Sequence, residues 1–121
     1  MPNRAISVLV VEDEALLLFS IADDLRAEGY TVFEASHADG AMRLLERHPE
    51  IRLLFTDIDM PGSMNGLALS ETVRRRWPPI KIIITSGKER PAPSDLPEGG
   101  VFVSKPYSPR GLSEQIRQMV Q

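Results

Sequence analysis

Several short apolar runs of this chain end in charged residues that could share a metal ion and a phosphate group. An early run ends in Glu12 and Asp13, a middle run in Asp57 and a late run in Lys105. A doubly wound α/β sheet binds its ligands at the carboxyl ends of its strands, where residues distant in sequence meet. Carboxylates are ligands of hard cations such as Mg²⁺, and a lysine ammonium binds phosphate oxygens as a point charge. The pattern therefore predicts a cation and phosphate site at one edge of a sheet.

Each of these residues also has an ordinary structural explanation. Asp13 could cap a following helix, and Glu14 suits the positive first turn of that helix. Lys105 could be a solvated surface lysine. Thr85, which ends another apolar run, could offer a hydroxyl to phosphate, although a β-branched residue is ordinary in a strand. Three acids at adjoining strand ends repel one another unless a metal ion lies among them, which favours a shared site.

Strand-like and helical segments alternate along the whole chain. Helices are expected from Asp13 to Gly29, from Asp39 to His48, from about Asn65 to Arg76 and from Pro109 to Val120. Strands are expected at Ser7–Val11, Tyr30–Ala35, Ile51–Thr56, Ile80–Thr85 and Val101–Ser104. Continuous apolar runs of this kind are typical of strands that are buried on both faces. We therefore expect one α/β domain over residues 1–121, a (βα)₅ doubly wound parallel sheet with helices on both faces.

The segment between the fourth and fifth predicted strands breaks this rhythm. It contains Pro91, Pro93 and Pro97 and few other apolar residues, so a long amphipathic helix is disfavoured. We expect the fourth helix to be short, irregular or missing. The segment is either a surface loop or a region that becomes ordered on modification or partner binding.

The composition excludes several functional classes. A chain of 121 residues fits one domain, and 14 Lys and Arg against 17 Asp and Glu give no basic field for nucleic acid. There is no cysteine for a disulfide or a thiolate metal site. No apolar run approaches the roughly 20 residues of a membrane span, and the N-terminal run is too short for a signal peptide. We expect a cytoplasmic protein with no direct nucleic-acid or membrane partner.

Together these residues resemble the receiver domain of two-component response regulators. The resemblance rests on Glu12-Asp13, on Asp57 within Asp57-x-x-Met60-Pro61-Gly62, on Thr85 and on Lys105-Pro106, in this order over nearly the whole chain. It implies a flavodoxin-like sheet with the strand order 2-1-3-4-5. Because the chain ends just after the last helix, we expect a stand-alone regulator, a phosphate shuttle or a phosphate sink rather than a protein with an attached effector.

The resemblance also implies a role for each acid. Mg²⁺ would bind Asp13, Asp57 and the main-chain carbonyl of Asp59, with Glu12 acting through water. Asp57 would accept a phosphoryl group from the phosphohistidine of a histidine kinase or a histidine phosphotransfer protein. The domain would be self-phosphorylating and self-dephosphorylating, and not an enzyme with a separate substrate.

Two further strands would bind and report the phosphoryl group. Lys105 and Thr85 would contact its oxygens, and the added negative charge could draw Thr85 inward. The vacated space would let Phe102 rotate inward, so Phe102 is the candidate switch residue, with ordinary core packing as the alternative. A downstream protein target would read this change.

Four features depart from the usual receiver pattern. The loop from Pro61 to Gly66 is one residue longer, and Asp59 is acidic where the attacking water would pass. We hypothesise that Asp59 tunes the lifetime of the phosphoryl group. Ser86 and Gly87 replace the alanine and polar residue that often follow the threonine. The proline-rich segment 88–99 makes the usual dimerisation and output face unpredictable.

Other classes fit parts of the pattern. Asp57-x-Asp59 after an apolar strand also suits a Mg²⁺-dependent aspartyl-nucleophile phosphohydrolase resembling the haloacid-dehalogenase family, whose motif usually follows the first strand. A metal-dependent nucleic-acid enzyme would lack a basic track for its substrate. A degenerate receiver used as a scaffold is a third possibility, against which the intact acids and Lys105 argue.

Overall fold

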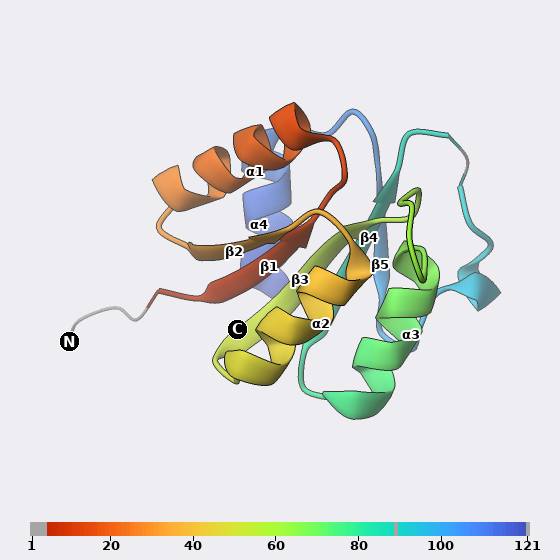
Figure 1. Ribbon diagram of the computed structural model, residues 1–121. Helices are drawn as coiled ribbons and strands as arrows, with labels where there is room; N and C mark the ends of the chain where they lie inside the picture. Colours follow the sequence, from red (N-terminus) through yellow and green to blue (C-terminus); the bar gives the residue numbers. More distant parts are fainter. Residues whose placement is uncertain (1–4, 89, 121) are drawn as a thin grey trace.

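A computed structural model describes residues 5–88 and 90–120 of the chain. Five strands form one parallel sheet in the order β2-β1-β3-β4-β5 (Figure 1), which confirms the predicted fold. The strands are β1 (Ser7–Val11), β2 (Thr31–Ala35), β3 (Ile51–Asp57), β4 (Lys81–Ser86) and β5 (Val101–Ser104). The helices are α1 (Ala15–Ala27), α2 (Ala38–Arg47), α3 (Gly66–Arg76) and α4 (Pro109–Met119). No helix among the described residues is both long and apolar enough to span a membrane.

Helices cover both faces of the sheet, as right-handed crossovers between parallel strands require (Figure 1). α1 and α4 lie on one face, where Leu25 and Ile116 are fully buried among side chains of β1 and β3. α2 and α3 lie on the other face, where Leu45, Leu69 and Val73 are buried. Every residue of β1 is buried, because this strand is central and covered on both sides. The two apolar layers fix the sheet on which the charged strand ends meet.

The connection from β4 to β5 contains one three-residue 3₁₀ turn, η1 (Pro93–Asp95), and no other helix. This confirms the prediction for the proline-rich segment, at least over the residues that the structure describes. The segment is tied to α3, because Arg74 Nη2 lies 3.0 Å from a Glu98 carboxylate oxygen and Arg74 Nε donates to the Glu98 carbonyl oxygen. Leu96 packs against the core on the α2 and α3 face. The crossover between β4 and β5 is therefore an irregular segment that is anchored at a few points.

Most elements differ by one or two residues from their predicted bounds, and two of these differences have a clear local reason. β4 begins at Lys81 and continues through Ser86, because Ser86 pairs with Ser104 of β5. α2 begins at Ala38, because the His37 side chain caps the helix by accepting the Gly40 N–H at Nδ1. Hydrogen bonding thus extends both elements past the points where the apolar pattern stops.

Candidate functional site

Three carboxylates meet at the carboxyl edge of the sheet, as the sequence predicts. One oxygen from each of Glu12, Asp13 and Asp57 lies within 4.8 Å of the others. Glu12 and Asp57 are buried, whereas Asp13 is exposed. Glu14 occupies the N-cap position of α1, and no side chain caps that helix, so Asp13 does not serve as the cap. Three oxygen ligands at this spacing fit a hard divalent cation with water completing its shell.

Lys105 lies against two of these acids. Its Nζ atom is 3.2 Å from Glu12 Oε1 and 3.2 Å from Asp57 Oδ2. β5 delivers the side chain to this place, and the Lys105 N–H donates to the Ser86 carbonyl oxygen as the strand ends. With a side chain only 21% exposed, Lys105 is not the solvated surface lysine of the alternative explanation. Its ammonium is the one positive charge that contacts the acid cluster within the described residues.

Burial governs the protonation of Glu12. Its side chain is 2% exposed, and this burial raises the pKa of Glu12 above its ordinary value. The Glu14 N–H donates to Oε2 at 3.0 Å and opposes the rise, while the charge of Asp57 adds to it. Glu12 therefore gains a proton more readily than a free glutamate does, and a cation in the cluster would favour the ionised carboxylate.

The pKa of Lys105 is raised as well, which for a lysine favours the charged form. Burial alone would lower its pKa, but the hydrogen bonds and charges of Asp57 and Glu12 outweigh that effect. The pKa of Lys105 is accordingly raised above its ordinary value, and its ammonium stays charged at neutral pH. A permanent positive charge next to Asp57 suits the binding of an anionic group there.

The Thr85 hydroxyl is buried next to Asp57 without a partner. Thr85 pairs with Asp57 in the register of β3 and β4, and its side chain is fully buried. Among the described residues, Oγ1 has no hydrogen-bond partner. A buried polar atom normally has a partner, so this one points to a group that the site is built to receive.

The Asp59 carboxylate accepts a hydrogen bond at the end of β4 and is not one of the three clustered acids. Ser86 Oγ donates to Asp59 Oδ2 at 3.0 Å, and the Asp59 N–H donates to Asp57 Oδ1 over 3.3 Å. The role that the resemblance implies for the main-chain carbonyl of Asp59 stays a prediction. The structure shows that hydrogen bonds hold both the backbone N–H and the carboxylate of Asp59.

Phe102, the candidate switch residue, is partly buried and packs against the core beneath α2 and α3. The guanidinium of Arg90 lies over its ring, 5.4 Å from the ring centre. Phe102 therefore packs as an ordinary core residue on one side and contacts the β4–β5 segment on the other. Its rotation on phosphorylation stays a prediction.

Gly66 is a site residue that the sequence analysis did not identify. Its N–H donates to the Ile58 carbonyl at 2.9 Å, and a Cβ atom at this position would lie 2.0 Å from the carbonyl oxygen of Asp57. Only glycine allows the start of α3 to approach the Asp57 peptide so closely. The sequence signal was the Asn65-Gly66 pair at a helix start, where Asn65 Oδ1 accepts the Ala68 N–H.

Tyr107 is a second residue near the site that the sequence analysis did not identify. Its hydroxyl is buried and has no partner within the described residues, and its ring meets Phe55 edge to face. Burial and the charges of Glu12 and Asp57 raise its pKa well above the ordinary range, so the phenol is neutral. It lies near the acids without contacting them by a hydrogen bond.

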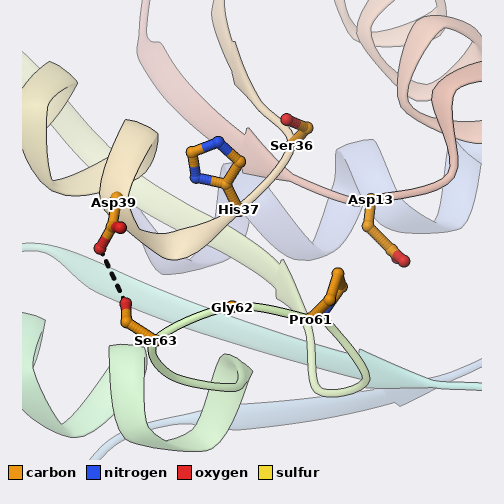
Figure 2. Close-up of a pocket in the computed structure, with 7 residues that line it drawn as sticks. All are labelled: Asp13, Ser36, His37, Asp39, Pro61, Gly62 and Ser63. Carbon is orange, nitrogen blue, oxygen red and sulfur yellow. Dashed lines mark hydrogen bonds between the residues drawn. The ribbon is translucent and has the colours of Figure 1, made fainter.

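An open pocket of about 430 Å³ adjoins the acid cluster and shares Asp13 with it (Figure 2). At its other end the loop that contains Ser63 is tied to α2, because Ser63 Oγ donates to Asp39 Oδ1 at 2.8 Å. His37 and Pro61 line the space between. Loop residues 61–63 therefore line one side of this pocket, and the extra length of the loop stays a prediction.

A family model for the response regulator receiver domain matches residues 8–117. The chain belongs to this family. Receiver domains are signalling domains of two-component systems that interact with histidine kinases and downstream effectors. Membership disfavours the phosphohydrolase and nucleic-acid enzyme alternatives that the sequence left open.

Relatives of known structure and sequence agree with this assignment. The chain is 31% identical to the chemotaxis protein CheY homolog of Campylobacter jejuni over 119 residues, covering 93% of this chain and 91% of that protein. It is 32% identical to the sensor kinase CckA of Brucella abortus, covering 95% of this chain but 12% of that protein. A receiver domain from Methanospirillum hungatei superposes with a TM-score of 0.86 at 28% identity, covering 97% of this chain and 94% of that one. The chain thus spans 12%, 25% and 48% of the length of the first three curated relatives, which are all much longer proteins.

Proposed function

We propose that Asp57 accepts a phosphoryl group from the phosphohistidine of a histidine kinase or a histidine phosphotransfer protein. The observation that carries this proposal is the environment of the Asp57 carboxylate. It lies 3.2 Å from the Lys105 ammonium, beside two further acids and beside the unpartnered hydroxyl of Thr85. A positive charge, a free donor and a set of cation ligands are the groups that an anionic phosphoryl group requires.

The acid cluster fits Mg²⁺, with Asp13 and Asp57 as ligands and Glu12 acting through water. When bound, Mg²⁺ would neutralise the repulsion between the Asp57 carboxylate and the incoming phosphoryl group. Glu12 also accepts from Lys105, so it holds the ammonium in place while its own charge adds to the cation site.

The chain's own residues supply the rest of the transfer step. An oxygen of Asp57 forms the new P–O bond as the P–N bond to the donor imidazole breaks. The electron pair of that bond returns to the imidazole nitrogen, which takes a proton from solvent. Lys105 and the Thr85 hydroxyl then contact the phosphoryl oxygens, where negative charge is concentrated. Because Lys105 already contacts Asp57, little reorganisation is needed.

We propose the start of α1 as the surface that meets the donor protein. Leu16 and Phe19 are 84% and 62% exposed, and α1 begins two residues after the cluster acid Asp13. Among the described residues they are the large apolar side chains that lie this open to solvent. They are three positions apart and so lie on the same side of the helix. An apolar stripe beside a charged site would hold a partner while the chemistry proceeds.

The response would be read at β5 and at the β4–β5 segment. Phosphorylation of Asp57 adds charge next to Thr85, and Phe102 lies one position before the residue that pairs with Thr85. Rotation of Phe102 would break its contact with Arg90 and release the segment, changing the surface offered to a target protein. Capture of partners with and without phosphorylation would separate a target-binding regulator from a phosphate shuttle or sink.

Intact mass spectrometry with acetyl phosphate tests the proposal. We expect one phosphoryl adduct that requires Mg²⁺, is labile to base and is absent from Asp57→Asn. Asp23→Asn, which removes an acid from an exposed position of α1, is the matched control and should keep the adduct. A folded protein that gains no adduct would instead favour the scaffold alternative.

A further inference from the structure

Ser86 makes a directed hydrogen bond to Asp59 across two strand ends. Its side chain is 4% exposed at the end of β4, and Oγ lies 3.0 Å from Asp59 Oδ2. The same oxygen accepts the Lys88 N–H at 3.2 Å. A backbone N–H can only donate, so the single hydroxyl hydrogen of Ser86 is left to point at the Asp59 carboxylate. Two partners thus fix the direction of this bond.

The bond decides where the Asp59 carboxylate lies. Asp59 is otherwise exposed and follows the phosphoacceptor by two residues, so an untethered side chain could turn to solvent or to the acid cluster. Ser86 instead holds it at a cavity of about 180 Å³ that both residues line, together with Arg90 and Asp95 of the β4–β5 segment. At the other end of the residue, the Asp59 N–H donates to Asp57. The backbone of Asp59 is therefore held against the phosphoacceptor, and Oδ2 of its carboxylate is already occupied by Ser86.

We infer that Ser86 is a positioning residue that sets the lifetime of the phosphoryl group by orienting Asp59. This inference rests on the proposed phosphorylation of Asp57. In hydrolysis, the oxygen of a water molecule bonds to phosphorus and the P–O bond to Asp57 breaks. The Asp57 carboxylate is regenerated and inorganic phosphate leaves, with the proton of the water passing to Asp59 and then to solvent. Asp59 Oδ1 accepts no hydrogen bond from the described residues and is free to orient that water.

Decay of the adduct in a set of variants tests the inference. Wild type, Ser86→Ala, Ser86→Thr, Asp59→Asn and the Ser86→Ala, Asp59→Asn double variant are loaded with acetyl phosphate and Mg²⁺. After the donor is removed, the phosphoryl adduct is followed by intact mass. We expect Asp59→Asn to slow the decay by about 100-fold, the lower end of the range for a lost proton acceptor. Ser86→Ala should slow it by about three- to tenfold, and Ser86→Thr, which keeps the hydroxyl, should restore most of the rate.

The double variant separates positioning from a general structural effect. If Ser86 acts through Asp59, adding Ser86→Ala to Asp59→Asn should change the decay by less than about 1.5-fold. Hydrogen exchange supplies a readout that does not depend on phosphorylation. The Lys88 amide should exchange faster in Ser86→Ala, because it loses its acceptor, and should change little in Asp59→Asn.

Several results would overturn the inference. One is a decay in Ser86→Ala that is unchanged or faster than in wild type. Another is a slowing by Ser86→Ala that persists in full when Asp59 is already asparagine. Failure of Ser86→Thr to restore the rate would also count against it. Absence of any adduct in wild type would refute the proposed function itself, so the two failures are distinct.

Discussion

Gly66→Ala should displace Asp57, the proposed phosphoacceptor, without touching its side chain. The new Cβ atom would lie 2.0 Å from the Asp57 carbonyl oxygen and 2.7 Å from its carbonyl carbon. Ordinary contact begins at 3.4 Å, so the start of α3 and the Asp57 peptide must separate by a further 1.4 Å. Neither atom is the end of a flexible side chain that could move aside. Overpacking of this kind costs about 1–3 kcal/mol in the free energy of unfolding.

The displacement should also slow phosphorylation. Misplacing a reacting group by about 1 Å can lower a rate about 100-fold, and here the shift falls on the residue that carries the nucleophile. The assay is the rate at which the adduct forms with acetyl phosphate and Mg²⁺, together with urea unfolding. Gly87→Ala is the matched control, because its Cβ would meet Lys105 Cδ at 3.5 Å, an ordinary contact. Neither glycine has a positive φ, so backbone strain does not distinguish them. A Gly66→Ala variant as stable and as fast as wild type would refute the reasoning.

Three further predictions concern the charges around the site. Burial raises the pKa of Glu12 from 4.5, so the folded chain holds this proton more tightly, and stability is lost as pH rises from 4.5 through the raised value. Glu12→Gln should flatten this loss in urea unfolding without Mg²⁺, and an unchanged pH profile would contradict it. Mg²⁺ at ten times its dissociation constant should raise the unfolding free energy of the wild type by about 1.4 kcal/mol. The same Mg²⁺ concentration should raise the unfolding free energy of Asp13→Asn by clearly less. Thermal unfolding measures both effects. Arg74→Ala breaks the exposed ion pair with Glu98 and should lower the free energy of unfolding by less than about 1 kcal/mol. It should nevertheless raise amide hydrogen exchange across residues 90–100. Unchanged exchange there would contradict the anchoring of this segment by Arg74.

The sequence was sufficient to predict the fold because its signals are strong and agree with one another. Runs such as Ser7–Val11 have the composition of strands buried on both faces, and their alternation with helical segments leaves few topologies. The meeting of Glu12, Asp57 and Lys105 then follows from topology alone, since the carboxyl ends of parallel strands share one edge. The prolines between β4 and β5 were equally informative, because they disfavour a long helix, and the described residues of that segment form only a short 3₁₀ turn.

The remaining features depend on tertiary contacts that have no local pattern. The need for glycine at Gly66 arises from the approach of α3 to the Asp57 peptide, which no spacing rule gives. Ser86 could be noted as a departure from the receiver pattern, but its bond to Asp59 joins residues on different strand ends. Tyr107 looked like any aromatic residue in a loop, and only the packed structure buries its hydroxyl. Such contacts exist only once the elements are docked.

The wide separation in sequence of the site's charges has a consequence for biosynthesis. The bond between Glu12 and Lys105 spans 93 residues, and Lys105 reaches the acids only after β5 has docked against β4. A chain emerging from the ribosome therefore has its acids long before it has their cation. Because domains fold as units, a nascent chain without β5 and Lys105 would lack the cation that the proposed phosphoryl transfer needs. Competence of Asp57 in the proposed transfer would thereby itself be a check that β5 has been synthesised and docked.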